Sequence, residues 1–287
     1  MSETDRITVQ AALIPATQAL AAAGIPGAGR DARLLMAHAL GLAPDRLTLV
    51  LRDPLDPGAK AAFAAALARR LAREPVSHIL GYREFHGHRF EVGRDVLDPR
   101  PETEILVAEA LSRPFASVLD LGTGSGAILL SLLAERPRAM GLGTDLSEAA
   151  LAVARRNAAA LDLGARARFR RADWWQGVDG VFDLIVSNPP YISAAEMAGL
   201  APELSHEPRG ALTDEADGLS AYREIARQAG AFLAPGGRIA LEIGPTQGSA
   251  VAGLLLAQGF RSVRVIPDLD GRDRVVRADA PEPAPAS

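Results

Sequence analysis

The sequence contains no cysteine, a single lysine (Lys60) and no long apolar run. The absence of cysteine excludes disulfide bonds, a thiol nucleophile and a cysteine-ligated metal. No apolar run approaches the roughly 20 residues that cross a bilayer, and no charged-then-apolar signal segment opens the sequence. We therefore expect a cytoplasmic protein that has no part in a membrane.

An excess of positive charge is also missing. The 287 residues carry a formal net charge of −4 at pH 7, with 48% hydrophobic and 23% charged residues. This composition is that of a globular protein with room for one large domain and a smaller one. Because a negative chain is poorly suited to neutralise many phosphates, we expect no stable binding of nucleic acid.

Residues 1–77 are predicted to form a small helical bundle. Apolar residues recur there at helical spacing in three segments, 7–23, 31–40 and 59–72. The pattern then changes, in residues 78–98, to short aromatic stretches broken by glycines, which predicts a β-hairpin linker. In that linker His86 and His88 have no acidic or cysteine cluster to complete a metal site, so we expect no metal.

Residues 99–279 alternate strands and helices, which predicts an α/β domain with a doubly wound, seven-stranded, mainly parallel Rossmann-like sheet. The tail 280–287 is rich in proline and alanine and is predicted to be disordered. The seven expected strands cover residues 118–121, 140–144, 167–170, 182–187, 238–243, 262–266 and 274–277.

A glycine loop follows the first of these strands and opens a helix. Glycines there let the backbone turn sharply and approach a nucleotide-type ligand closely. The acid Asp145 ends the next strand, at the distance along the chain expected for a ribose-binding carboxylate. The spacing of the glycines is more typical of S-adenosylmethionine enzymes than of NAD enzymes. The loop comprises Gly122, Thr123, Gly124, Ser125 and Gly126.

Asp173 and Trp174, after the third strand, are a candidate adenine clamp. An indole face can stack on a purine, while Asp173 can accept a hydrogen bond from its amino group. Trp174 falls at the carboxyl edge of the sheet, where ligands bind in such folds. We interpret its neighbour Trp175 as a core residue.

The segment Asn188, Pro189, Pro190 and Tyr191 follows an apolar strand. Two consecutive prolines hold an extended backbone and remove two N–H donors, leaving carbonyl oxygens free to accept. The Asn188 side chain adds an acceptor and Tyr191 a flat face. The segment therefore predicts a socket for a planar group that carries an NH2, either an amide or an exocyclic amine.

Such a nitrogen is a poor nucleophile because its lone pair is delocalised. We expect the Asn188 side-chain oxygen and the Pro189 carbonyl to accept both of its N–H hydrogens, which favours turning the pair toward an electrophilic methyl group and stabilises the growing positive charge. Tyr191 would hold the planar group flat in a near-attack geometry. These three are the predicted catalytic residues, and no strong base is needed because the methylated nitrogen is acidic.

Taken together, the motifs resemble those of the release factor glutamine methyltransferases, the PrmC/HemK family. The Asn-Pro-Pro-Tyr segment alone is shared by several amino-methyltransferases, whereas the Pro-Arg-Pro-Glu-Thr-Glu segment after a helical domain is much more specific. The resemblance covers nearly the whole chain, through residues 73–85, 96–104, 120–128, 183–192, 217–222, 237–244 and 270–275.

The resemblance implies a class I methyltransferase domain with S-adenosyl-L-methionine as methyl donor. It implies, as acceptor, the glutamine of the Gly-Gly-Gln motif of class I peptide chain release factors, and so a role in translation termination. Residues 122–126, Asp145, Trp174 and Asn188 would contact the cofactor, and residues 188–191 the glutamine. Domain 1–77 and the hairpin would dock the release factor. The sequence departs from the family at His86 and Asp98.

Three other functions are compatible with parts of the pattern. A nucleic acid amino-methyltransferase would use the same socket, but it would have to extract its base and bind phosphates. A module that only binds a release factor or a nucleotide would not need both Asn188 and the glycine loop. An NAD oxidoreductase would need a proton-relay group near that loop, and none is obvious.

Overall fold

The computed structural model describes residues 7–282, which divide into two compact units. Residues up to Tyr82 form one unit together with the distant segment Pro202–His206, and residues 83–201 and 207 onward form the other. We call them the helical unit and the sheet unit. Of the predicted disordered tail, residues 283–287 lie outside the described residues, while Ala280 is buried and its N–H donates to the Gly237 carbonyl.

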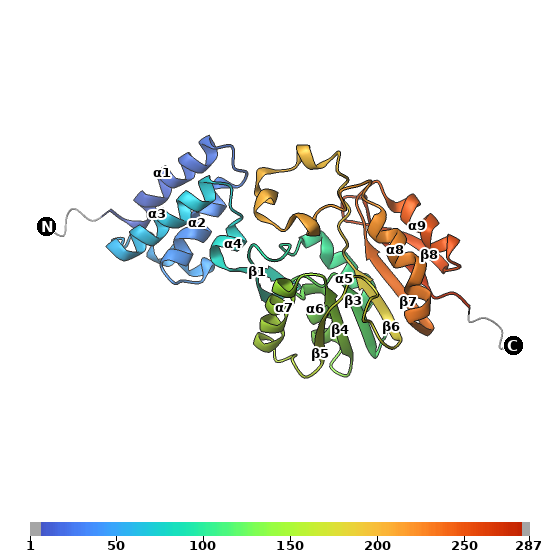
Figure 1. Cartoon of the computed structure of the whole chain (residues 1–287). Helices are drawn as coiled ribbons and strands as arrows, with labels where there is room; N and C mark the ends of the chain where they lie inside the picture. The colour runs from blue at the N-terminus through green and yellow to red at the C-terminus, as the bar shows by residue number, and fades with distance from the viewer. Residues whose placement is uncertain (1–6, 283–287) are drawn as a thin grey trace. The chain divides into compact units, whose positions relative to one another are not determined.

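In the helical unit, α1, α2 and α3 pack side by side (Figure 1). Thr8 caps α1 and Asp56 caps α3, each through a side-chain oxygen that accepts from the first turn. Buried side chains such as Leu20, Leu35 and Leu47 form its core. The helices are α1 Val9–Ala22, α2 Ala28–Ala39, the 3-10 helix η2 Pro44–Val50, α3 Pro57–Leu71 and α4 Val76–Leu80.

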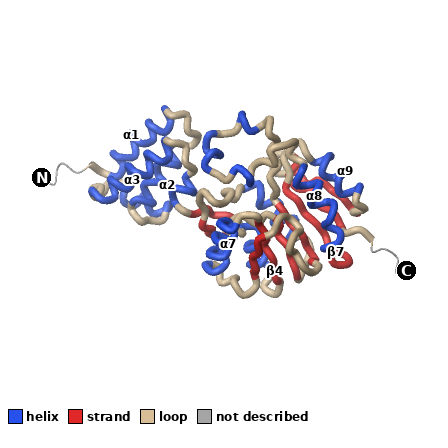
Figure 2. Tube along the Cα trace, viewed as in Figure 1, coloured by secondary structure: helices blue, strands red, loops and turns tan. Residues whose placement is uncertain are grey.

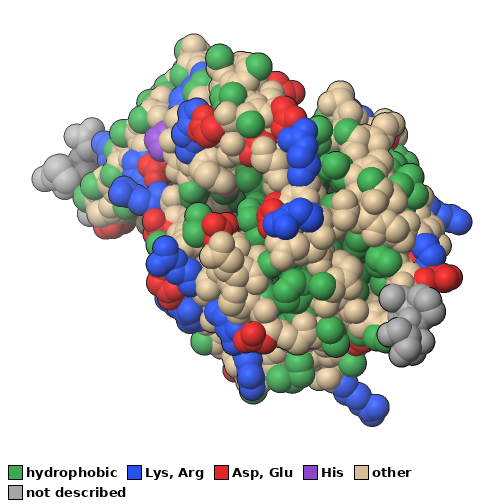
Figure 3. Space-filling view, turned by 45° about the vertical axis from the view of Figure 1, so that its right-hand side comes forward, with side chains coloured by type: hydrophobic (Ala, Val, Ile, Leu, Met, Phe, Trp, Pro, Cys, Tyr) green, Lys and Arg blue, Asp and Glu red, His purple; other side chains and the backbone are tan. Residues whose placement is uncertain are grey.

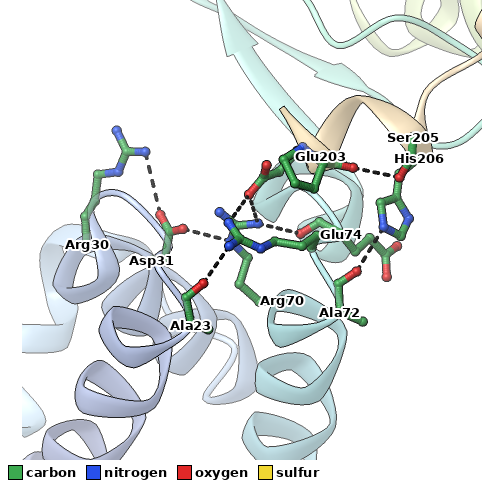
Figure 4. Close-up of polar contacts among 11 residues, drawn as sticks. Ala23, Arg30, Asp31, Arg70, Ala72, Glu74, Glu203, Ser205 and His206 are labelled. Carbon is green, nitrogen blue, oxygen red and sulfur yellow. Dashed lines mark hydrogen bonds and ion pairs between the residues drawn. The ribbon is translucent and has the colours of Figure 1, made fainter. Parts of the chain in front are cut away.

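The segment Pro202–His206 is held to the end of α3 by an ionic cluster (Figure 4). Arg70 donates from Nε to Asp31 Oδ2 at 2.9 Å and from Nη1 to Glu203 Oε1 at 3.1 Å. Arg73 Nη1 donates to the same Glu203 oxygen at 3.2 Å. Arg70 and Asp31 are almost fully buried, whereas the Glu203 and Arg73 side chains are 22% and 28% exposed, so the cluster joins a buried ion pair to a partly exposed one.

A two-stranded hairpin, β1 Tyr82–Phe85 and β2 His88–Glu91, follows the helices. His86 and Gly87 at its tip both have positive φ, the conformation of a tight hairpin turn. Phe85 and Phe90 are buried in the core of the sheet unit, so the hairpin contributes its aromatic side chains to that unit.

The sheet, whose strands are red in Figure 2, has the order β5-β4-β3-β6-β7-β9-β8. Strand β9 is antiparallel to both its neighbours, and the first five strands in this order are parallel. This confirms the predicted seven-stranded, doubly wound α/β fold. The strands are β3 Ser117–Leu121, β4 Met140–Asp145, β5 Ala167–Arg171, β6 Phe182–Ser187, β7 Leu233–Glu242, β8 Arg261–Pro267 and β9 Asp273–Asp279.

Helices cover both faces of the sheet. Successive strand residues point to opposite sides, so Val118 packs in the core with α5 and α6, and Leu119 packs in the core with α8 and α9. No helix among residues 7–282 is long and apolar enough to cross a membrane. The α-helices of this unit are α5 Glu104–Leu111, α6 Ala127–Glu135, α7 Glu148–Ala160, α8 Ser220–Ala229 and α9 Gly248–Ala257.

Short 3-10 helices complete the connections. The long crossover between β6 and α8 contains three of them, and a further one precedes α5 and another precedes β7. They are η3 Pro101–Thr103, η4 Met197–Gly199, η5 Pro202–His206, η6 Arg209–Ala211 and η7 Gly230–Phe232.

Candidate active site

A cavity of about 350 Å³ opens at the carboxyl ends of the parallel strands in the sheet unit. It lies where the chain reverses direction across the sheet, between β4-β3 and β6, the usual ligand position in this kind of fold. Loops after four strands contribute to its wall: Gly122, Thr123, Gly124 and Ser125 after β3, Asp145 at the end of β4, Asp173 and Trp174 after β5, and Asn188, Pro189 and Pro190 after β6.

The glycine loop presents backbone to the cavity. Gly122 and Gly124 have φ values of +70° and +54°, and a β-carbon at either would meet no protein atom within 4 Å. The loop is fixed from below by Thr123, whose hydroxyl donates to Asp120 Oδ2 at 2.6 Å. Burial of Asp120 raises its pKa to about 7, against the lowering effect of the Thr123 bond. The positive φ values of Gly122 and Gly124 favour glycine for the loop conformation, and the absence of a side chain at both residues leaves the cavity open to a ligand.

Gly126, the last residue of the predicted loop, does not line the cavity. It has φ +80° and precedes α6, and a β-carbon there would lie 3.2 Å from the β-carbon of Ala154 in α7. Gly126 thus permits close helix packing, whereas the first two glycines face the cavity. Asn157 of α7 adds to this packing by donating from Nδ2 to the Ser125 carbonyl at 2.9 Å.

Asp145 is positioned by backbone donors from both sides. Gly124 N donates to its Oδ2 at 2.9 Å, and Ser147 N donates to its Oδ1 at 2.9 Å. Burial raises the pKa of Asp145, and these backbone bonds oppose that shift. Each carboxylate oxygen can accept a further bond, so two hydroxyl groups of a ligand can still be bound.

Asp173 and Trp174 line the cavity, and Trp175 does not. Trp174 has φ +51°, a conformation that non-glycine residues adopt rarely. Trp175 is buried, stacks on Phe232 with ring centroids 4.7 Å apart, and donates from Nε1 to the Glu224 carbonyl. The interpretation of Trp175 as a core residue is confirmed.

Asn188 follows the last residue of β6, and only the NH2 end of its side-chain amide has polar partners within residues 7–282. Its Nδ2 atom lies 3.4 Å from Thr103 Oγ1, and its amide is close enough to the carboxyl group of Glu242 to lower the pKa of that group. Its Oδ1 atom is buried and has no hydrogen-bond partner in the described chain. A buried acceptor left unpaired in a cavity wall is costly unless a ligand supplies the donor.

Tyr191 is not part of the cavity wall. Its carbonyl oxygen accepts from Gln247 Nε2 at 2.9 Å, and a β-carbon on Gly218 would lie 2.4 Å from that same oxygen. Burial raises the pKa of its hydroxyl. The structure thus brings Asn188 and both prolines to the cavity, whereas the partly buried Tyr191 packs against the buried core that includes residues of α8 and α9.

Sequence reasoning gave no role to Thr103 and Glu242. Thr103 lines the cavity and contacts Asn188, and Glu242 is the last residue of β7. An acid at the end of a parallel strand was a usable signal, because strand ends of this fold meet at the ligand site. Asp98 also lines the cavity and is buried, with its Oδ2 atom 3.8 Å from Arg100 Nη1.

Two family models match the chain. The PrmC N-terminal domain matches residues 11–81, and the methyltransferase small domain matches residues 94–217. A methyltransferase crystal structure from Pyrococcus furiosus superposes with a TM-score of 0.54 and 19% identity, over 76% of this chain and 99% of that chain. At that identity the likeness shows the fold alone.

Curated relatives match over nearly the full length. A release factor glutamine methyltransferase of Cereibacter sphaeroides is 60% identical over 271 residues, 94% of this chain and 98% of the relative. One of Rhodospirillum rubrum is 48% identical over 263 residues, 90% of this chain and 81% of the relative. With the sheet, the cavity and the family models in agreement, this chain belongs to the release factor glutamine methyltransferase family.

Proposed function

We propose that this protein methylates the side-chain amide nitrogen of the glutamine in the Gly-Gly-Gln motif of class I peptide chain release factors, with S-adenosyl-L-methionine as donor. It would thereby act in translation termination. The observation that carries this proposal is that Asn188 lines the cavity and that its buried Oδ1 atom has no hydrogen-bond donor among the described residues. The names of the curated relatives support the choice of acceptor.

The cavity fits S-adenosylmethionine in its size and donor set. Its volume of about 350 Å³ lies within the range of small-molecule sites. Asp145 would accept from the ribose hydroxyls, while Asp173 and Trp174 would hold the adenine. Gly122 and Gly124 leave room where a side chain would intrude. When bound, this cofactor supplies an electrophilic methyl group.

The chain's own residues would orient and polarise the acceptor amide. Asn188 Oδ1 and the Pro189 carbonyl would each accept one N–H of the glutamine NH2 group, so that its lone pair turns out of the amide plane. Pro190 would help to keep the amide flat, with Tyr191 behind it. Such preorganised acceptors stabilise positive charge as it develops on the nitrogen.

We assign substrate docking to residues 1–77 and the hairpin linker 78–98, and the chemistry to residues 99–279. The match of residues 11–81 to the PrmC N-terminal domain supports this division. On the face seen in Figure 3, basic and acidic side chains lie next to one another, and the net charge is −4. This mixture suits a protein partner better than a phosphate backbone.

The test of the function is mass spectrometry of a class I release factor after incubation with this protein and S-adenosylmethionine. We expect one added methyl group on the glutamine of the Gly-Gly-Gln peptide. A release factor with glutamate in that position is the matched control, because it offers no N–H to the two acceptors. Methyl label found in DNA or RNA and not in the release factor would overturn the proposal.

The cofactor assignment has its own test in Asp145→Asn. An amide has one acceptor oxygen where the carboxylate has two, so one ribose contact and the charge are lost. We expect the affinity for S-adenosylmethionine, measured by calorimetry, to fall by about tenfold or more. Unchanged affinity would remove Asp145 from the cofactor site.

A further inference from the structure

Glu242, the last residue of β7, is a buried carboxyl group that the chemistry above does not use. The residue is 1% exposed, and its Oε2 atom has no hydrogen-bond partner among residues 7–282. Parallel β6 and β7 pair Ser187 with Leu241, so Asn188, which follows β6, and Glu242, the last residue of β7, lie beside one another at the carboxyl edge of the sheet. Glu242 therefore stands behind a cavity residue.

The contacts of Glu242 converge on one end of the Asn188 side chain. Its carboxyl group has the Thr103 hydroxyl and the Asn188 amide as polar neighbours, and both lower its pKa. Asn188 Nδ2 also lies 3.4 Å from Thr103 Oγ1. Both neighbours thus engage the NH2 end of the amide, and the oxygen end is left without a partner in the described structure.

We propose that Glu242 is a positioning residue that fixes which way the Asn188 amide points. An ionised carboxylate can only accept, so it keeps the Asn188 NH2 group turned toward itself and leaves Oδ1 for the cavity. A protonated carboxyl group can also donate, and it would then stabilise the flipped amide. The flipped amide would present donors to the substrate NH2 group, which needs acceptors. The inference rests on the proposed function.

The surroundings of Glu242 allow it to change protonation near neutral pH. Burial, the largest influence, raises its pKa to about 7, although the Thr103 bond, a nearby arginine and the Asn188 bond lower it. The tyrosines that face it have raised pKa values, so they stay protonated near neutral pH. The titratable and charged groups around it are Arg274 of β9, Glu102 of η3, Tyr191 and Tyr222.

Three substitutions separate positioning from packing. Glu242→Leu removes the acceptor, Glu242→Gln supplies a neutral group that both accepts and donates, as the protonated acid does, and Thr103→Val removes only the linking hydroxyl. We expect Glu242→Leu to lower kcat/KM for the release factor by about tenfold or more, because Asn188 is then free to flip. The affinity for S-adenosylmethionine, measured by calorimetry, should change by less than about twofold in all three.

Within this set, Glu242→Gln, which can donate as well as accept, should show at every pH the reduced kcat/KM of the wild type below about pH 7, and Thr103→Val should show an intermediate loss. Thr103→Val is close in shape to the parent residue, so it keeps the test decisive if Glu242→Leu does not fold. The proposal would be overturned if Thr103→Val and Glu242→Leu both kept the wild-type kcat/KM. If Glu242→Leu does not fold, a wild-type kcat/KM in Thr103→Val alone would overturn it. So would a loss of cofactor affinity as large as the loss of kcat/KM.

The pH profile is a readout that a purely structural role would not move. At saturating cofactor, we expect kcat/KM of the wild type to fall as the pH is lowered through about 7, because protonated Glu242 releases the Asn188 orientation. Saturation removes effects of Asp120, which titrates in the same range but supports the cofactor loop. Glu242→Gln should lack this decline, and an equal decline in that variant contradicts the inference.

Nuclear magnetic resonance tests the orientation without any substrate. The side-chain amide signals of Asn188 can be assigned by their loss in Asn188→Ala. We expect them to move in the wild type as the pH crosses about 7 and to stay in place in Glu242→Gln. Stationary signals in the wild type would overturn the positioning role, whereas an unmethylated release factor would overturn the proposed function, so the two failures are distinct.

Discussion

In the helical unit the buried guanidinium group of Arg70 lies between the carboxylates of Asp31 and Glu203. In the sheet unit the buried carboxyl group of Glu242 has the neutral Thr103 and Asn188 as its polar neighbours. The first cluster matches cation to anion and lines no described cavity wall. The second includes Oδ1 of Asn188, which is buried, unpaired and part of a cavity wall.

This difference separates a structural cluster from a functional one. Buried charges that pair with one another hold chain segments together, as Arg70 holds Pro202–His206 to α3. A buried polar atom that has no hydrogen-bond partner in a cavity wall costs free energy. A ligand that supplies the missing hydrogen bond recovers that free energy. Asp31 Oδ1 of the ionic cluster is also buried without a hydrogen bond but lines no described cavity wall, so it is the position of the unpaired acceptor in a cavity wall, rather than the number of charges, that points to the site.

The largest expected effect comes from breaking the ionic cluster. Arg70→Met leaves Asp31 and Glu203 without their shared cation, and we expect a loss of about 3–5 kcal/mol in unfolding free energy, measured by chemical denaturation. Arg30→Met is the matched control, because Arg30 is exposed and lies 3.6 Å from the same Asp31, so about 0–1 kcal/mol is expected. Equal losses in the two variants would show that burial adds nothing to this cluster.

Removing the open acceptor should affect catalysis and leave folding intact. In Asn188→Ala the substrate amide loses one of its two acceptors, and we expect turnover to fall by about 100- to 1000-fold. Cofactor binding, followed by calorimetry, should persist because the glycine loop and Asp145 remain. Turnover at the wild-type rate in Asn188→Ala would dismiss the acceptor role.

The two clusters should respond to pH with opposite signs. Glu242 ionises near its ordinary 4.5 when unfolded and near 7 when folded, so between these values the folded state binds more protons and loses stability as the pH rises. This corresponds to at most about 3 kcal/mol. We expect Glu242→Gln to gain stability relative to the wild type between pH 5 and about pH 8. A constant difference across that range would contradict the raised pKa.

Glu203 shifts the other way. Burial raises its pKa, but a backbone N–H together with Arg73 and Arg70 outweighs burial, so the pKa lies below its ordinary value. The stability that it contributes is present above the ordinary 4.5 and is lost as the pH falls through the lowered value. Denaturation of Glu203→Gln should therefore show its deficit above about pH 5 and less of it in stronger acid.

The smallest expected effect concerns docking. Leu49 of the helical unit is 72% exposed, so under the proposed docking role of this unit its apolar side chain is free to contact a protein partner. We expect Leu49→Ser to raise KM for the release factor by a few-fold and to leave kcat unchanged. Leu256→Ser, an exposed leucine of α9, is the control. Equal KM values in the two variants would remove Leu49 from the docking surface.

Local sequence signals failed where pairing with distant segments decided the structure. The predicted strand 238–243 begins at Leu233 instead. Residues 233–237 contain Pro235 and two glycines, which indicate a turn in the sequence, but in the structure Leu233 pairs with Phe182 of β6 and extends the strand. The predicted helix 31–40 begins at Ala28, where Gly27 provides a left-handed cap. The five-residue α4 was missed because it is too short to show periodicity.

The sequence by itself determined the seven-stranded α/β fold, the helical bundle before it and the family, because these follow from apolar periodicity and from motifs contiguous in the chain. The candidate residues from Gly122 to Pro190 also came from such motifs. Only the tertiary structure placed Glu242 behind Asn188 and Glu203 against Arg70. Those contacts join residues far apart in the chain, and strand register and burial, which local pattern does not encode, bring them together.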